Sequence, residues 1–215
     1  MVLALCALLV GQLTSKKPNA WDIRVLYPRF SAGGPVARAA NAGAKAQERK
    51  AFGEFLAEAR KPEEGMGPYS LDVTPHRITD RAGLASGYVE HSSYMGGPHP
   101  NLDYDVVNYG RVGGKVRSLR LNDLFRPGKD AVGEASRALV AIINAMDDAP
   151  SKVEEGQWKR LTAEQAKHFV VGPKGVLFLF DAYDLGSYAE GPRQILVPFS
   201  KLPGLDRKGV LKAVL

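Results

Sequence analysis

Apolar and polar positions recur along this chain with two different periods, which predict where its strands and helices lie. The first segment with the two-residue period of a strand is Trp21–Phe30, where Ile23, Val25 and Tyr27 alternate with polar neighbours. This alternation is typical of a half-buried strand, and Pro28 is expected to end it because proline cannot donate to a strand ladder.

Helical periodicity follows in two segments. An amphipathic helix is predicted over Arg38–Arg60, with its apolar face on Phe52, Phe55, Leu56 and Ala59. A second is predicted over Val132–Met146, with Asp130 as its N-cap. A shorter helix is expected over Leu161–His168, where Thr162 provides a cap signal.

Strand character returns in six later segments, separated by turn signals. They are Tyr69–Thr79, Leu84–Tyr94, Leu102–Tyr109, Phe169–Val171, Gly175–Phe180 and Ile195–Phe199. The order strand, helix, several strands, helix, strands predicts an α+β fold, a mostly antiparallel sheet packed with two main helices. No composition shift divides residues 21–215, so they are expected to form a single domain.

The N-terminus carries an apolar run, Val2–Val10, that is too short to span a bilayer as a helix. Polar residues follow it, which predicts a signal peptide or leader over residues 1–20, with Ser15 or Ala20 before the cut. No lysine or arginine precedes the run, so an N-terminal strand or helix of the domain is the alternative. Cys6, the single cysteine, lies in this segment, so the exported domain would contain no disulfide.

Composition narrows the class of protein. The chain has 215 residues, 45% hydrophobic and 24% charged, which suits one ordered globular domain. Its net charge is +6, but the lysines and arginines are scattered. We interpret this as a mildly basic solvated surface and expect no nucleic-acid partner; peripheral association with a membrane or the cell envelope stays open.

Catalytic motifs are missing from the sequence. It contains no GxSxG, P-loop, GxGxxG or HExxH pattern. Asp181 and Asp184 flank a turn, where hydrogen bonding of the turn explains them better than glycoside hydrolysis does. We therefore expect a binding module without a cofactor rather than an enzyme.

A metal site is the alternative suggested by His91, His99, Asp103 and Asp105, because imidazole and carboxylate suit zinc. Their spacing matches no metalloenzyme motif, and Asp103 and Asp105 could equally form the wet face of a strand. We expect no metal here. A hydrolase or metal-dependent enzyme using His99 with Asp103 or Asp105 remains the competing hypothesis.

Two loops are the candidate ligand sites. Gly96 to Pro100 combines glycines and prolines, so it would be a preorganised loop presenting His99 and Asn101, or a rigid turn fixed by His99. The second loop contains Tyr183, Tyr188 and Gly191, which would contact a sugar or protein, or would instead close the end of the sheet.

Three stretches in order carry a family resemblance: Ser92–Asn101 with Asn108–Gly110, Leu119–Phe125, and Gly175–Gly191 running into Ile195–Phe199. They resemble the extracytoplasmic domain of unknown function shared by the lysozyme-sensing anti-sigma factor RsiV and the N-terminal module of peptidoglycan deacetylases such as PdaC. The resemblance covers most of residues 21–205.

The resemblance implies a secreted or periplasmic location and a non-catalytic binding or sensing function. Its ligand would be an envelope protein, a lysozyme-like protein or a peptidoglycan glycan; the alternative is a hydrolase acting on peptidoglycan. Animal lysozymes are basic, so long-range repulsion would oppose their binding. Because functional loops cluster at one end of a scaffold, we expect His99, Asn101, Tyr183 and Tyr188 to lie along one rim.

Overall fold

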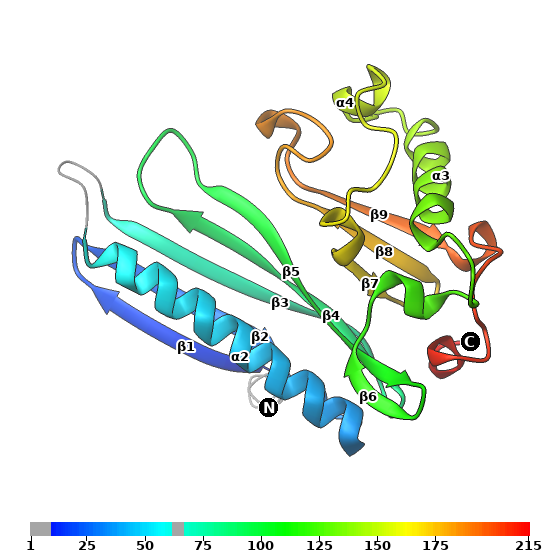
Figure 1. Cartoon of the computed structure of the whole chain (residues 1–215). Coiled ribbons are helices and arrows are strands. Elements are labelled where there is room, and N and C mark those ends of the chain that lie inside the picture. The colour runs from blue at the N-terminus through cyan, green and yellow to red at the C-terminus, as the bar shows by residue number, and fades with distance from the viewer. Residues whose placement is uncertain (1–9, 62–66) are drawn as a thin grey trace, which may run out of the picture.

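The computed structural model describes residues 10–61 and 67–215, and arranges them as two β-sheets with helices packed on them (Figure 1). The larger sheet has the strand order β1-β2-β3-β4-β5-β6, and the smaller has the order β7-β8-β9. The α+β class and the mostly antiparallel pairing are confirmed. The division into two sheets was not expected from the sequence pattern.

The larger sheet is antiparallel except at one pair. Its strands are β1 (Val10–Lys17), β2 (Trp21–Pro28), β3 (Tyr69–Arg81), β4 (Leu84–Tyr94), β5 (Asn101–Val112) and β6 (Lys115–Ser118). β2 and β3 are parallel, whereas the other neighbours are antiparallel. A parallel pair needs a crossover connection, and the long helix α2 (Gly34–Ala59) supplies it. Figure 1 shows α2 lying along one face of the sheet.

Small residues allow α2 to approach the sheet closely. Its buried stripe comprises Val36, Ala37, Ala40, Ala44, Glu48, Phe55 and Ala59. At Gly43 an added Cβ would lie 2.2 Å from the Tyr109 hydroxyl oxygen, so this position has no room for a side chain. The helix begins four residues before its predicted start, with Pro35 in its first turn, where proline's missing N–H costs nothing.

The smaller sheet forms a second layer with the second main helix. It consists of β7 (Phe169–Val171), β8 (Gly175–Phe180) and β9 (Arg193–Pro198), and α3 (Ala131–Ile143) packs against it in the largest apolar cluster. The Asp130 side chain accepts a hydrogen bond of 2.9 Å from the Gly133 N–H, which confirms it as the N-cap of α3.

Shorter helical segments connect these elements. They are α4 (Ser151–Glu154) and the 3₁₀ helices η1 (Leu121–Leu124), η2 (Gln165–Lys167), η3 (Tyr188–Glu190), η4 (Phe199–Lys201) and η5 (Val210–Ala213). The helix predicted over Leu161–His168 is thus only a 3₁₀ turn. The Thr162 cap is present, since its Oγ1 accepts from the Gln165 N–H at 3.1 Å.

Three side chains of the larger sheet hydrogen-bond to the backbone of β7. Thr79 Oγ1 donates to the Val171 carbonyl at 2.7 Å, and Ser86 Oγ accepts from the Val171 N–H at 2.7 Å. Asn108 Nδ2 donates to the Phe169 carbonyl. β7 is an edge strand with fully buried side chains, so these bonds satisfy backbone groups that neither strand pairing nor solvent would satisfy.

The N-terminal segment differs from its expected boundary. Residues 10–17, assigned to a leader by the sequence pattern, pair with β2 over the whole of β1, from Val10 opposite Pro28 to Lys17 opposite Trp21. The folded unit therefore begins no later than Val10, rather than at residue 21. Most of the apolar run lies outside the described residues. No helix in the described part of the chain is long and apolar enough to span a membrane.

The close approach of α2 predicts opposite effects for one substitution at two positions of the same helix. Gly53→Ala should raise the free energy of unfolding by about 0.5–1 kcal/mol, because alanine favours the helix and its methyl group would have no atom within 4 Å. Gly43→Ala should lower it by about 1–2 kcal/mol, because Tyr109 must move. Chemical denaturation measures both. Equal stabilisation by the two substitutions would contradict the packing described.

Candidate functional site

The two loops singled out in the sequence meet in the structure. The rings of His99 and Tyr188 stack with centroids 3.6 Å apart and planes 18° from parallel. The Tyr188 hydroxyl donates a hydrogen bond of 2.6 Å to the Pro100 carbonyl. The loop between β4 and β5 is therefore joined to the loop between β8 and β9 by a ring contact and a hydrogen bond.

Tyr183 extends this aromatic cluster toward solvent. Its ring lies 5.7 Å from that of Tyr188, tilted by 43°, and the residue is 53% exposed. Its φ is 73°, in the left-handed region that non-glycine residues with bulky side chains rarely adopt. The Lys152 ammonium donates to its carbonyl, which helps to hold this conformation.

The first loop is partly exposed and is held by contacts within the loop. Gly96 and Gly97 have φ of 89° and 100°, and the Tyr94 hydroxyl donates to the Gly97 carbonyl at 3.1 Å. His99 Nδ1 lies 3.1 Å from the carbonyl oxygen of Pro100. The turn-fixing contact considered for His99 is thus present, but the ring also remains partly exposed beside Tyr188.

The remaining predicted site residues lie at the margins of the cluster. Asn101 is exposed at the first position of β5, opposite Ser93 of β4. Gly191 ends η3 with a φ of 71°, and its N–H donates to the Tyr188 carbonyl at 2.9 Å. Gly191 therefore shapes the turn that carries Tyr188.

Asp181 fixes the start of the second loop. Its Oδ1 accepts from the Tyr104 N–H at 2.8 Å, and its own N–H donates to Asp184 Oδ2 at 3.0 Å. Burial raises the pKa of Asp181 to about 6, against the opposing effects of the Tyr104 hydrogen bond and of His168. These contacts agree with the turn function expected for Asp181 and Asp184.

Glu190 fixes the end of the same loop. Its carboxylate accepts from the Ser187 N–H at 2.8 Å and from the N–H and hydroxyl of Ser151 at 2.9 and 2.7 Å. These hydrogen bonds lower the pKa of Glu190 to about 2. The loop is thereby attached to the beginning of α4.

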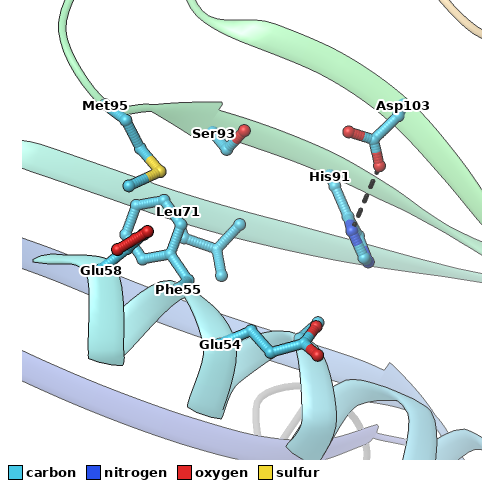
Figure 2. A pocket seen from close by; sticks show the side chains of 9 residues that line it. Glu54, Phe55, Glu58, Leu71, His91, Ser93, Met95 and Asp103 are labelled. Atoms are coloured by element: carbon cyan, nitrogen blue, oxygen red, sulfur yellow. Dashed lines mark ion pairs between the residues drawn. The ribbon is translucent and has the colours of Figure 1, made fainter.

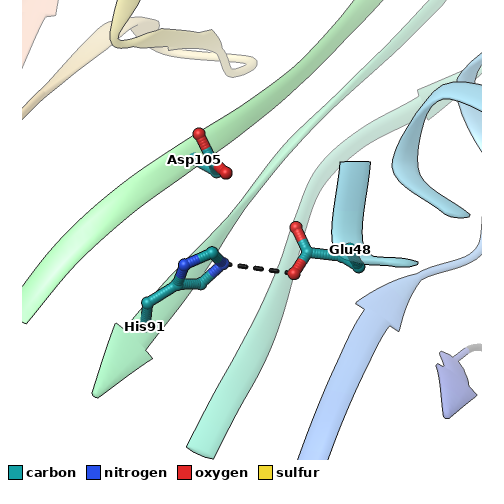
Figure 3. A group of neighbouring side chains, drawn as sticks. All are labelled: Glu48, His91 and Asp105. Atoms are coloured by element: carbon teal, nitrogen blue, oxygen red, sulfur yellow. Dashed lines mark hydrogen bonds and ion pairs between the residues drawn. The ribbon is translucent and has the colours of Figure 1, made fainter. Parts of the chain in front are cut away.

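A second polar cluster lies between α2 and the larger sheet. Figure 3 shows the carboxylate of Glu48 facing the ring of His91, with Asp105 beside them on β5. His91 Nε2 is 3.2 Å from Glu48 Oε2, and His91 Nδ1 is 3.3 Å from Asp103 Oδ1. Glu48 is fully buried and His91 is 8% exposed.

The charges in this cluster are coupled. Burial alone would lower the pKa of His91, but hydrogen bonds to Asp103 and Glu48 and their charges outweigh it and raise that pKa to about 10. Burial in turn raises the pKa of Glu48, which the facing His91 only partly offsets. The Glu48–His91 pair therefore retains a proton at neutral pH.

Of the four residues considered for a metal site, His91, Asp103 and Asp105 lie together in the structure. Glu48 joins them: ligand atoms of Glu48, His91 and Asp105 lie within 4.8 Å of one another, and Asp103 contacts the same histidine. His99 instead stacks on Tyr188. A pocket of about 320 Å³ opens beside His91 and Asp103 (Figure 2).

Glu48 was not found from the sequence, although a signal existed. The buried face of α2 includes Ala40, Ala44 and Glu48, which are four residues apart. Glu48 is therefore a charged residue at a position where helical periodicity predicts an apolar one. A charge in such a position needs a partner, and His91 and Asp105 on the facing strands supply the polar surroundings.

Comparisons with known proteins support the fold. Residues 122–200 match a family model described as a protein of unknown function, DUF3298. A crystal structure of a DUF3298 family protein from Pseudomonas aeruginosa has a TM-score of 0.61 at 18% identity, over 92% of this chain and 94% of that chain. One from Bacteroides fragilis has a TM-score of 0.60 at 16% identity, covering 95% of each chain. No curated protein sequence matches this chain significantly.

The hydrogen bonds of the Glu190 carboxylate, which attach the second loop to α4, predict that the stability of the folded chain depends on pH. The pKa of Glu190 is about 2 in the folded chain against an ordinary 4.5, so its contribution is complete above about pH 4.5 and is lost as the pH falls toward 2. Glu190→Gln should therefore lower the melting temperature at pH 6, with a difference from the parent that shrinks toward pH 2.5.

Thermal unfolding followed by circular dichroism measures this difference. Glu58→Gln, at an exposed position on α2, controls for the loss of one negative charge. A difference between the parent and Glu190→Gln that stays constant from pH 6 to 2.5 would show that Glu190 does not fix the loop through its charge.

Proposed function

We propose that this chain is a non-catalytic, extracytoplasmic binding module that binds a cell-envelope glycan on the surface formed by His99, Tyr183 and Tyr188. The observation that carries the proposal is Tyr183, an exposed aromatic residue held in a left-handed backbone conformation. The fold and the family model leave the function open, so the support comes from this surface.

Stability gives no reason for a tyrosine at position 183. A left-handed conformation costs a residue with a Cβ about 1–2 kcal/mol, a cost that glycine avoids. The side chain is 53% exposed, so it recovers little of this cost through burial. Strained residues that persist without a structural benefit are concentrated at ligand sites, which favours a binding role for Tyr183.

The surface is also preorganised. Tyr188 is fixed by its hydrogen bond to Pro100 and by stacking on His99, and Glu190 attaches its loop to α4. A rigid aromatic surface loses little conformational entropy on binding, and tyrosine and histidine supply both ring faces and hydrogen-bonding atoms. Sugar rings, which present C–H faces edged by hydroxyl groups, match this combination.

Charge favours a glycan over a lysozyme-like protein as the ligand. The chain has a net charge of +6, which attracts anionic envelope polymers and repels a basic protein at long range. The stretches that resemble the RsiV and PdaC domain include both loops of the proposed surface, which supports an extracytoplasmic location. Since residues 10–17 form β1, a cleavage that preserves the sheet must fall before Val10.

The competing hydrolase hypothesis required His99 to act with Asp103 or Asp105. Asp103 instead faces His91 at 3.3 Å, and His99 stacks on Tyr188. This arrangement places both carboxylates beside His91 rather than beside His99, and it disfavours that reaction centre.

Tyr183→Gly separates binding from stability. Glycine adopts the left-handed conformation without strain, so the melting temperature should stay the same or rise. The affinity for purified peptidoglycan should fall by about tenfold or more, equivalent to about 1.4 kcal/mol, because an exposed aromatic anchor is lost. Sedimentation with peptidoglycan and calorimetry with its soluble fragments measure the affinity.

Leu196→Ala is the matched control, because it removes an exposed apolar side chain from β9 outside both loops. A basic animal lysozyme serves as the protein probe. The proposal fails if Tyr183→Gly retains full affinity, if only the lysozyme binds, or if the parent chain binds no envelope glycan. Recovery of the intact chain only from the cytosol of its host would contradict the extracytoplasmic location.

A further inference from the structure

The cluster between α2 and the larger sheet contains a buried oxygen atom without a partner. Glu48 is fully buried, and its Oε2 faces His91, but its Oε1 has no hydrogen-bond partner among the described residues. An unsatisfied buried carboxylate oxygen is costly, because water no longer solvates it and nothing replaces that solvation. Figure 3 shows this carboxylate directed toward the space between His91 and Asp105.

The charges around this oxygen are also unbalanced. Three carboxylates, those of Glu48, Asp103 and Asp105, surround a single imidazole ring. A proton on His91 compensates only one of them. A cation in the space between these groups would satisfy the free oxygen and reduce the repulsion between the carboxylates.

The geometry points to a divalent transition-metal site, and we propose that Glu48, His91 and Asp105 bind an ion such as Zn²⁺. Their ligand atoms lie within 4.8 Å of one another, and His91 Nε2 is 3.2 Å from Glu48 Oε2. Tetrahedral ligands at zinc-like bond lengths lie about 3.3 Å apart, so one pair already has this spacing and the third requires a side-chain adjustment.

Asp103 completes the arrangement from outside the ligand set. Its Oδ1 lies 3.3 Å from His91 Nδ1, so it can accept the Nδ1–H and leave Nε2 free for the metal. A metal-bound histidine commonly donates its other ring N–H to a carboxylate, which orients the ring. Asp103 is directly opposite His91 in the β4–β5 register, so the backbone pairing holds the two in place.

The ligand chemistry selects the class of ion. One imidazole with two carboxylates suits Zn²⁺ and related transition ions, whereas Mg²⁺ prefers oxygen ligands alone. A pocket of about 320 Å³ lies beside His91 and Asp103, next to the proposed ligands (Figure 2). A bound ion would join α2 to β4 and β5.

The metal site is independent of the glycan surface, because it uses none of that surface's residues.

The test is calorimetric titration of the chelator-treated full chain with Zn²⁺, together with thermal unfolding. We expect one ion per chain, a dissociation constant below about 10 µM, and a rise of several degrees in melting temperature, because an ion bound only to the folded state stabilises it. Mg²⁺ at the same concentration should produce neither effect.

Variants identify the site. Glu48→Gln and Asp105→Asn each remove one ligand charge and should weaken Zn²⁺ binding by about tenfold or more, as should Asp103→Asn through the histidine. The visible absorption of Co²⁺ bound in place of Zn²⁺ should disappear in Glu48→Gln. Because Glu48→Gln keeps the shape of the side chain, it is expected to fold even if His91→Ala does not.

His168→Ala is the matched control. His168 also faces a carboxylate, since its Nδ1 lies 3.6 Å from Asp181 Oδ2, but it belongs to no three-residue group of ligand atoms in the described part of the chain. Its replacement should leave Zn²⁺ binding unchanged. Absence of saturable binding by the parent chain overturns the proposal. So does binding that survives both Glu48→Gln and Asp105→Asn, or that is lost in His168→Ala.

Discussion

Hydrogen bonds to the buried backbone edge of β7 join the smaller sheet to the larger one. Side chains of Thr79, Ser86 and Asn108, from three adjacent strands of the larger sheet, hydrogen-bond to backbone groups of this strand. Ser86 and Asn108 are also bonded to each other at 2.5 Å. Buried polar groups without partners are costly, so these hydrogen bonds favour the observed position of the smaller sheet on the larger one.

This fixed position brings the two loops together. The loop with His99 connects strands of the larger sheet, whereas the loop with Tyr183 and Tyr188 connects strands of the smaller one. Their contact thus depends on the orientation of the two sheets as well as on the loops themselves. The face of the larger sheet under α2 is separate, and it carries the Glu48 cluster. One scaffold therefore presents an aromatic surface and encloses a polar cluster in different places.

Local patterns were sufficient to predict most elements from the sequence. Alternation and strand character between turn signals predicted β2 to β5 and β7 to β9, and Asp130 predicted the start of α3, whereas β1 and β6 were not predicted as strands. The attachment of β7 could not be predicted, because it joins residues 61 to 92 positions apart through side chains common in any strand. β1 was interpreted as part of a leader because an apolar run precedes it. The meeting of His99 and Tyr188 was expected only from the general clustering of functional loops, whereas Glu48 required attention to one charge in an apolar stripe.

If the β7 contacts fix the two sheets, the free protein already holds His99 against Tyr188. Nuclear Overhauser effects between the ring protons of these two residues, measured on the free protein, report this contact. Strong cross-peaks are expected, since the ring centroids are 3.6 Å apart. Absence of these cross-peaks, with ring-proton shifts of an unstructured chain, would show that the aromatic surface is not preformed.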